Sequence, residues 1–462
     1  MFRTVEIPVW ALVLLFGFAA VTFASHFLFP SVRWFFRKRA ERAVAQLNAR
    51  LKRPIQPFKL ARRTDTINRL IHDPEVAQAI LDHARETGTP ETVAFETARR
   101  YAREIVPSFS ALLYFGWGTG LARWLSRGLY RVRVTGEAVL DDVDPDATVV
   151  FVMNHRSNMD YVLVTWLTAR RTSLSYAVGE WARRWPLRPI IRAMGGYFVR
   201  RRDLNPLYRK VLARYVQIAT RAGVTQAVFP EGRLSRDGAL QPPKLGILSY
   251  VMDAHEPAGR DVVFVPVALN YERVLEDRSL IADTKAPGAA QLSWLSVALY
   301  FLNHAQLRLT GRFTRFGYAA VSYGTPLSLR AFLAEGPQDP TAALGDALLR
   351  RVADVLPVLP VPLVAEALAD GARDIDAVSG HLDRAAAAHA GSGHPVHHAS
   401  RDSGKVARTA LGMLEARGLV QIANDRLTVP SEAEDLLRFY ARTLPVQSSK
   451  GSENYVKFEV GV

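Results

Sequence analysis

Short apolar stretches alternate with amphipathic ones through the middle of the chain. Residues 148–153 read Thr-Val-Val-Phe-Val-Met, a continuous apolar run that is typical of a strand buried on both faces. Stretches with the period of an amphipathic helix follow at 206–222 and 244–254. Further strands are predicted at 173–178, 196–200, 225–229, 262–268 and 316–323. This alternation predicts an α/β domain over 131–330, with a central, mostly parallel sheet flanked by helices.

The pattern changes on either side of this domain. Before it, apolar positions recur with helical spacing, so 31–130 is predicted to be a basic and helical region. After it, stretches rich in Gly, Pro, His or Ser at 335–340 and 391–404 predict loops. A helix, a hairpin and a helix that starts with a capping box of Ser431 and Glu434 follow. The region 331–462 is therefore expected to be helical, with a small winged-helix-like unit.

The chain begins with an uncharged apolar segment at 7–29. About 23 residues span roughly 34 Å as a helix, which is enough to cross a bilayer core. A cleaved signal peptide is the competing interpretation, but only Arg3, offset by Glu6, precedes the segment, and basic residues follow it. We expect residues 1–30 to be a single-pass N-terminal transmembrane helix with the catalytic domain in the cytoplasm. A second uncharged stretch, 105–122, is either a short membrane segment or a buried or interfacial helix.

Composition narrows the classes of function. A net charge of +15 favours an anionic partner, which includes nucleic acid, an anionic lipid surface and a phosphorylated substrate. The absence of Cys excludes disulfides, thiolate catalysis and Cys-based metal sites. The histidines at 389, 394, 397 and 398 have no acidic or Cys pattern beside them, so no metal site is predicted.

The strand predicted at 148–153 runs directly into a polar cluster that contains His155 and Asp160, five positions apart. If a helix begins near Asn158, Asp160 lies in its first turn and its carboxylate can reach one imidazole nitrogen. The other nitrogen is then free to accept a proton. The pair is predicted to be a general base for a hydroxyl group that the substrate brings. The same spacing from His397 to Asp402 lies among Gly, Ser and other His residues without a strand before it, and is interpreted as a loop.

Three further predicted strands end in motifs with polar groups or proline. Gly-Gly-Tyr-Phe-Val-Arg-Arg-Arg at 195–202 combines glycines that let a ligand approach with arginine forks that suit a phosphate. Phe-Pro-Glu-Gly-Arg-Leu-Ser-Arg-Asp-Gly at 229–238 presents charges on a turn whose N–H groups can stabilise negative charge. Val-Pro at 265–266 lies in an apolar run, where proline marks a strand end or an edge.

In this order and spacing, the motifs resemble those of the glycerolipid acyltransferase superfamily: His-x4-Asp, Gly-x-Phe-x-Arg, Phe-Pro-Glu-Gly and an apolar Val-Pro. The resemblance covers about 145–325. The sequence His-Arg-Ser-Asn-Met-Asp-Tyr at 155–161 is most similar to the glycerol-3-phosphate and dihydroxyacetone-phosphate acyltransferase branch. One departure is Leu234, because the family usually has Glu-Gly-x-Arg-Ser and Arg233 here comes one place early.

The resemblance implies transfer of a fatty acyl group from acyl-CoA or acyl-ACP to glycerol 3-phosphate in phospholipid biosynthesis, without a cofactor and without a covalent acyl-enzyme. His155 would be the general base and Asp160 the carboxylate that orients it, while Val265 and Pro266 would line the acyl side. Arg233 and Arg236 are alternatives for one phosphate contact. The residues that would bind the substrate are Arg156, Ser157, Arg200, Arg201, Glu231, Gly232, Arg233, Ser235 and Arg236.

Two alternatives stay open at this point. An acceptor with its own acyl chain, lysophosphatidic acid, would need an apolar groove, and the long chain with its flanking helical region favours glycerol 3-phosphate. A membrane-tethered nucleic-acid-binding regulator would account for the basic charge and the winged-helix-like unit, but it leaves His155 and Asp160 unexplained. The expected partners are therefore membrane lipid, the thioester donor and glycerol 3-phosphate, and no nucleic acid.

Overall fold

The structure is a computed structural model, which describes residues 8–179, 183, 185, 187–200, 204–285, 315–398, 400 and 402–446. The chain divides into two compact units, Met1–Pro54 and Ile55–Val462. The first unit holds one long helix, α1 (Val9–Asn48). No helix in the described part of the chain has both the length and the apolar character that crossing a membrane requires. Residue 7 and the side chains of 19–37 lie outside the described residues, so the anchor at 7–29 stays a prediction.

Helices open the second unit, as the periodic pattern predicts. They are α2 (Pro57–Leu60), α3 (Arg63–Ile71), α4 (Pro74–Thr87), α5 (Glu91–Ile105), the π-helix η1 (Leu113–Gly118) and α6 (Thr119–Leu129). Asp73 caps the start of helix α4 because its carboxylate accepts the N–H of Glu75, and Pro74 is the first helical residue. The uncharged stretch 105–122 is not one continuous helix, since it contains the end of α5, a non-helical segment, η1 and the start of α6.

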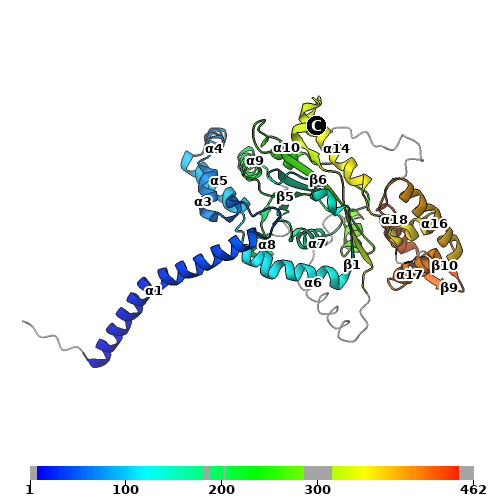
Figure 1. Ribbon diagram of the computed structural model, residues 1–462, viewed down its shortest axis with the longest axis horizontal. Coiled ribbons are helices and arrows are strands. Elements are labelled where there is room, and N and C mark those ends of the chain that lie inside the picture. Colours follow the sequence, from blue (N-terminus) through cyan, green and yellow to red (C-terminus); the bar gives the residue numbers. More distant parts are fainter. Residues whose placement is uncertain are drawn as a thin grey trace, which may run out of the picture. The chain divides into compact units, whose positions relative to one another are not determined.

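The centre of the second unit is a mixed, mainly parallel sheet (Figure 1). Its strands are β1 (Arg131–Thr135), β2 (Thr148–Met153), β3 (Ser175–Val178), β4 (Gly196–Phe198), β5 (Gln226–Val228), β6 (Val262–Tyr271), β7 (Tyr318–Tyr323) and β8 (Leu327–Ser328). They follow the order β1-β7-β6-β2-β5-β3-β4, with β8 beside β6. Every pairing is parallel except those of β6 with β7 and β8. The predicted α/β class is confirmed, and β2 lies inside the sheet.

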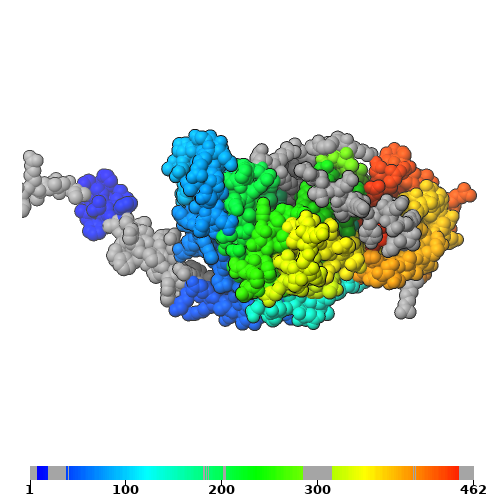
Figure 2. All heavy atoms as spheres, turned by 90° about the horizontal axis from the view of Figure 1, so that it is seen from above, coloured from blue at the N-terminus to red at the C-terminus, as the bar shows by residue number. Residues whose placement is uncertain are grey.

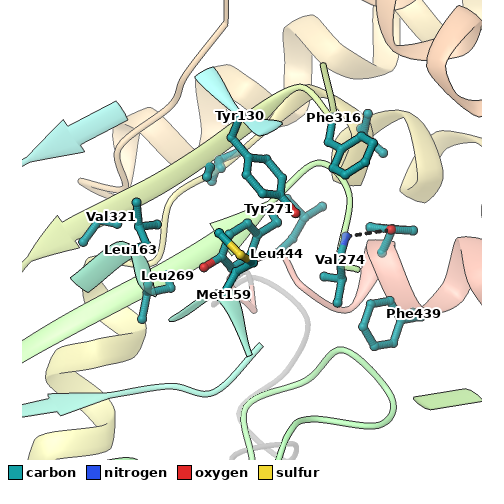
Figure 3. Packing of buried hydrophobic residues seen from close by; sticks show 14 of the residues in the cluster. Tyr130, Met159, Leu163, Leu269, Tyr271, Val274, Phe316, Val321, Phe439 and Leu444 are labelled. Carbon is teal, nitrogen blue, oxygen red and sulfur yellow. Dashed lines mark hydrogen bonds between the residues drawn. The ribbon is translucent and has the colours of Figure 1, made fainter. Parts of the chain in front are cut away.

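Both faces of the sheet are covered. Alternate side chains of β2 enter different apolar clusters, because successive residues of a strand point to opposite faces. Phe151 packs in one cluster with α7 (Met159–Thr168) and the C-terminal helices, while Val152 packs in the other with α5 and α9 (Pro206–Arg221). Figure 3 shows part of the first cluster, where Tyr130 and Tyr271 lie side by side. Burial on both faces accounts for the unbroken apolar sequence of β2.

Proline 266 lies inside β6, so the prediction that it marks a strand end or an edge was wrong. On one side β6 pairs continuously with β2 through Pro266. On the other side its partners change from β8 at Phe264 to β7 at Val267. The carbonyl of Pro266 accepts the N–H of Gly324 on that second side. Since the N–H and C=O of a strand residue point the same way, the missing N–H faces the gap between the two partner strands, where no ladder bond is lost.

The rest of the second unit is helical. The further helices are α8 (Leu187–Ala193), α10 (Gly246–Met252), α11 (Asp277–Lys285), α13 (Leu329–Ala334), α14 (Pro340–Asp354), α15 (Pro360–Ala369), α16 (Ile375–Gly391), α17 (Ser403–Glu415) and α18 (Glu434–Ala441). Figure 2 shows the orange and red C-terminal elements gathered together, with α15 packing against α16, α17 and α18. The hairpin of β9 (Gln421–Ala423) and β10 (Arg426–Thr428) lies between α17 and α18 in sequence, as predicted.

The predicted capping box of Ser431 and Glu434 is wrong. A 3-10 turn, η4 (Ser431–Ala433), leads into α18, and no side-chain hydrogen bond caps that helix. A helical turn ahead of Glu434 leaves no extended residue at the position where a serine caps. The predicted loops at 335–340 and 391–404 fall between helices as expected, and Asp402 caps α17 by accepting the N–H of Lys405.

Candidate active site

Strand β2 carries the polar cluster to the edge of the sheet. Its neighbours are β6 and β5, and the chain leaves it at Met153. The amide of Asn154 then bonds both backbone groups of Leu269 in β6, at 2.9 Å to the carbonyl oxygen and 2.7 Å from the N–H. Helix α7 begins at Met159, which places Asp160 in its first turn as predicted. The short loop from strand to helix is thereby anchored at both ends.

The imidazole of His155 and the carboxylate of Asp160 form a buried pair. His155 Nδ1 lies 2.9 Å from Asp160 Oδ2, and the two residues are 4% and 0% exposed. The same Oδ2 accepts the backbone N–H groups of Arg156 at 2.8 Å and Ser157 at 3.0 Å. With a carboxylate as its partner, Nδ1 carries the proton and Nε2 is left as a base. The pair that the His-x4-Asp spacing predicts is present.

Tyr271, at the end of β6, completes the surroundings of Asp160. Its hydroxyl donates a hydrogen bond of 2.6 Å to Asp160 Oδ1, the carboxylate oxygen that His155 does not use. Burial, together with the negative charge of Asp160, raises the pKa of Tyr271 well above its usual value. The phenol therefore keeps its proton and stays a donor. It holds the carboxylate from the side opposite the imidazole.

Aromatic rings enclose the imidazole. Phe229 stacks on it with ring centroids 4.1 Å apart and an interplanar angle of 30°, and Tyr161 meets it edge-on at 5.3 Å. Phe229 comes from the end of β5 and Tyr161 from α7, so two elements fix the plane of the ring. Fixed aromatic contacts of this kind limit both the rotation of the base and the access of water to it.

Glu231 and Arg156 are buried next to this pair. Glu231 Oε1 accepts the backbone N–H of His155 at 3.0 Å, while Oε2 has no hydrogen-bond partner among the described residues. Burial raises the pKa of Glu231 to about 7, although the nearby charge of Arg156 acts in the opposite direction. Arg156 is 1% exposed, and none of its three side-chain nitrogens has a hydrogen-bond partner within the described residues. Buried donors without partners are rare in folded proteins, and a guanidinium fork has the geometry that a phosphate takes.

The two serines predicted to bind substrate have partners inside the protein. The Ser157 hydroxyl donates to Glu276 Oε2 at 2.7 Å, and Asn158 donates its backbone and side-chain N–H groups to Oε1 of the same carboxylate. The Ser235 hydroxyl donates to the carbonyl of Ala239 at 2.7 Å, and its backbone N–H donates to the carbonyl of His155 at 3.0 Å. Both serines therefore shape the loops around His155.

The predicted arginines are in different surroundings from one another. Arg200 forms a two-pronged ion pair with Glu104, at 2.9 and 2.7 Å, and stacks on two tyrosine rings. Arg236 pairs with Asp283 at 2.6 Å, and Arg233 is exposed. Arg201 lies outside the described residues. Of the four described arginines that were predicted to bind substrate, Arg156 is the one buried beside the base without a paired guanidinium nitrogen.

The glycines of these motifs serve the turn and the packing. Gly232 has a φ of 68°, a left-handed backbone that turns the chain directly after Glu231. A Cβ at Gly195 would lie 2.9 Å from the carbonyl oxygen of Leu174, and one at Gly196 would lie 2.6 Å from the side chain of Ile191. Gly195 and Gly196 therefore allow the backbone of β4 to approach Leu174 and Ile191 closely. From the sequence, these glycines were predicted to let a ligand approach.

Residues 131–270, from β1 to the penultimate residue of β6, match the acyltransferase family model. The four site motifs lie within this match, and the similarity to curated relatives extends beyond it, to 338 residues in one case. Residues 131–270 are therefore similar to an acyltransferase domain, over 140 of the 462 residues of the chain.

Curated relatives of this chain are named glycerol-3-phosphate acyltransferase. The Pseudomonas putida protein is 29% identical over 338 residues, which is 68% of this chain and 40% of the relative. The Pseudomonas fluorescens protein is 30% identical over 353 residues, 70% of this chain and 40% of the relative. The Aeromonas hydrophila protein is 32% identical over 283 residues, 60% of this chain and 34% of the relative. The chain thus spans about 40% of the length of the first of these relatives.

Among solved structures, the chain is similar to the 1-acyl-sn-glycerophosphate acyltransferase PlsC of Thermotoga maritima. The two are 19% identical with a TM-score of 0.32, and the similarity covers 52% of this chain and 76% of that chain.

Val265 and Pro266 are buried in the centre of the sheet. Val265 is 0% exposed and pairs with Phe151 of β2, and Pro266 pairs with Val152. Their neighbours in the structure are protein atoms of the core, so the part they play is to build β6, which carries Tyr271 at its end. Contact with an acyl chain at these two residues stays a prediction.

Sequence reasoning missed Tyr271 and Glu276 as site residues. Both lie after the Val-Pro motif in the sequence, and Tyr271 is the last residue of β6. A tyrosine at the end of a strand next to the His155 strand was a usable signal, because parallel neighbours end at the same edge. No spacing rule links Glu276 to Ser157, which lies 119 positions earlier.

Proposed function

We propose that this chain moves a fatty acyl group from a thioester to glycerol 3-phosphate, in phospholipid biosynthesis. The observation that carries the proposal is the His155 imidazole, whose Nδ1 is held by Asp160 while Nε2 is left to act as a base. The names of the relatives, glycerol-3-phosphate acyltransferase, support the choice of acceptor. The donor is a thioester of coenzyme A or of acyl carrier protein. The apolar segment at 7–29 would anchor the enzyme on the cytoplasmic side of the membrane.

The reaction consists of two proton transfers and one displacement at the thioester carbon. Nε2 of His155 accepts the proton of the glycerol hydroxyl as the oxygen attacks the thioester carbon. The carbon–sulfur bond then breaks, and the proton passes from the imidazolium to the departing thiolate. The products are an ester and a free thiol, and neither a covalent acyl-enzyme nor a cofactor is needed. Asp160 stabilises the imidazolium that forms between the two proton transfers, and Tyr271 holds Asp160.

Arg156 would bind the phosphate of the acceptor. Its guanidinium is buried within the loop that carries His155, with donors that have no partner among the described residues. A two-pronged contact to a phosphate contributes about 2 to 3 kcal/mol. Arg156→Lys keeps the charge and loses the fork, so KM for glycerol 3-phosphate is expected to rise roughly 30- to 100-fold. Arg214→Lys is the matched control, because Arg214 already uses its fork on Asp73.

The proposal is tested by supplying labelled acyl-CoA and acyl carrier protein thioesters with either glycerol 3-phosphate or lysophosphatidic acid. We expect labelled 1-acylglycerol 3-phosphate from the first acceptor. Labelled phosphatidic acid from the second acceptor alone would refute the proposed substrate while leaving the chemistry of His155 in place. No transfer to either acceptor from either donor would refute the proposed activity.

A further inference from the structure

Tyr440 of α18 and Arg417, which follows α17, meet Asp277 at the start of α11. The Tyr440 hydroxyl and the Arg417 guanidinium both donate to Oδ2 of Asp277, and Arg417 also donates to the Tyr440 hydroxyl at 3.0 Å. The backbone N–H of Val274 donates to the same hydroxyl at 3.1 Å, as the dashed line at Val274 marks in Figure 3. Asp277 is 3% exposed and Tyr440 0%. The C-terminal helices therefore hold the segment after β6 through a buried polar network.

The residue before Asp277 is Glu276, which contacts the loop that carries the base. Its Oε2 accepts the Ser157 hydroxyl at 2.7 Å, and its Oε1 accepts the backbone and side-chain N–H groups of Asn158. The backbone N–H of Ser157 in turn donates to Asp160 Oδ2 at 3.0 Å. Because Asp277 and Glu276 are adjacent, a shift of the first carboxylate is passed directly to the contact at Ser157.

Helix α18 also contacts the turn after β5. Gly238 has a φ of 88°, and a Cβ there would overlap the carbonyl oxygen of Phe439, so glycine allows the turn to lie directly against the helix. Ser235 of the same turn donates its backbone N–H to the carbonyl of His155 at 3.0 Å. Two segments that bond to the loop of the base are thus in contact with α18.

Stability alone does not account for the network at Asp277. Moving a guanidinium and a carboxylate out of water is costly, and apolar side chains of similar size can fill such a place at equal or lower cost. A fully bonded polar network instead specifies one arrangement, because each donor and acceptor fits one geometry. At Asp277, that arrangement fixes the position of the neighbouring Glu276.

We propose that Arg417 and Tyr440 are positioning residues for the acyl transfer. By fixing Asp277 they hold Glu276 in place, and Glu276 holds the loop that carries the base. The C-terminal helical region thereby contributes to the rate through the geometry of the base. This role rests on the acyl transfer proposed above and extends it to residues outside the matched range 131–270.

The test compares acyl transfer to glycerol 3-phosphate by Arg417→Met, by Glu276→Ala and by the variant with both changes. We expect each single change to lower kcat about tenfold or more, and the double variant to lie within about twofold of Glu276→Ala. Arg417→Lys keeps a charged donor and should recover most of the lost rate. Arg438→Met is the matched control, because Arg438 of α18 pairs with Glu434 at the surface, and it should keep the wild-type kcat. Thermal unfolding gives the folded fraction of each variant.

Carbethoxylation of His155 by diethyl pyrocarbonate is a second readout, and it needs no activity. His155 is 4% exposed, so the rate of its modification reports how often the loop opens. In Arg417→Met we expect this rate to rise about tenfold, with no change at the exposed His72, both followed by mass spectrometry of peptides. Tyr440→Phe keeps the ring and should show the same two effects if Arg417→Met does not fold.

A folded Arg417→Met enzyme with the wild-type kcat and an unchanged rate of His155 modification would overturn the positioning role. So would losses of kcat that multiply in the double variant, since Arg417 would then act independently of Glu276. A wild-type enzyme that transfers no acyl group would instead refute the proposed function, and the modification rates would still test the positioning.

Discussion

Replacing Tyr271 with phenylalanine removes one hydroxyl group and leaves the ring in place. That hydroxyl lies 2.6 Å from Asp160 Oδ1 in a site without solvent exposure. A hydrogen bond to a charged group contributes about 1.5 to 3 kcal/mol, and the other donors described around Asp160 bond its second oxygen, Oδ2. Without the donor, Asp160 can rotate, and this change releases the imidazole of His155 from its working tautomer. The loss corresponds to roughly a 10- to 100-fold fall in kcat/KM.

The assay for Tyr271→Phe is acyl transfer to glycerol 3-phosphate, with thermal unfolding measured in parallel. We expect kcat/KM to fall while the protein stays fully folded at the assay temperature. A variant that is merely less stable would regain the wild-type rate once the rate is divided by its folded fraction.

Tyr130→Phe is the control. Tyr130 is buried beside Tyr271 (Figure 3), with ring centroids 5.3 Å apart. Its hydroxyl, however, donates to the backbone carbonyl of Arg273 at 2.8 Å. This variant should lose about 1 kcal/mol of stability and keep kcat/KM within about threefold of the wild type. Equal loss of kcat/KM in the two variants, or an unchanged rate in Tyr271→Phe, would refute the role of the tyrosine at Asp160.

Three further predictions concern carboxylates and a tyrosine outside the base itself. Burial raises the pKa of Glu272 to about 7 in the folded chain from an ordinary value of 4.5, so the folded state binds the proton more tightly. Its contribution to stability is therefore present below about pH 4.5 and is lost as pH rises to 7, by up to about 1.4 kcal/mol per pH unit. In Glu272→Gln, the free energy of unfolding from urea denaturation should depend less on pH between 4.5 and 7. The same pH dependence in the variant and the wild type would contradict this prediction. Tyr440→Phe removes a hydroxyl that bonds Asp277, so the melting temperature should fall by an amount equivalent to about 1 to 3 kcal/mol. Glu276→Gln weakens the contact with Ser157 and should reduce kcat about tenfold with KM little changed, which steady-state kinetics would show.

The central strand and the base could be predicted because their signals are local. Residues 148–153 read as a strand buried on both faces, and the structure has β2 at those residues. Asp160 is near His155 because a helix starts one turn after the strand, which is again a local event. Strand β1 was missed since its arginines alternate with valines at the edge of the sheet, and β8 has only two residues.

The other contacts of the site depend on pairings distant in sequence. Tyr271 contacts Asp160, 111 positions away in sequence, because β6 and β2 are neighbours in the sheet. The sequences of the two strands do not show that they are neighbours, so this contact could not be predicted from them. The partner of Arg200 is Glu104, which lies in α5, a helix that precedes the sheet. Because this pairing is distant in sequence, Arg200 was predicted to bind substrate, whereas it forms an ion pair within the protein. Pro266 was placed at an edge because the break between β7 and β8 beside it was not foreseen.

The most direct test of the proposed mechanism is acyl transfer from a labelled thioester to glycerol 3-phosphate by His155→Ala, compared with wild type in the same membranes. The imidazole is the only group placed here as the base, so its loss should reduce the rate at least about 1,000-fold while binding of the acceptor is retained. Asp160→Asn, which keeps the shape of the pair and removes its charge, should also be strongly impaired. A His155→Ala enzyme that transfers the acyl group at the wild-type rate would contradict the account.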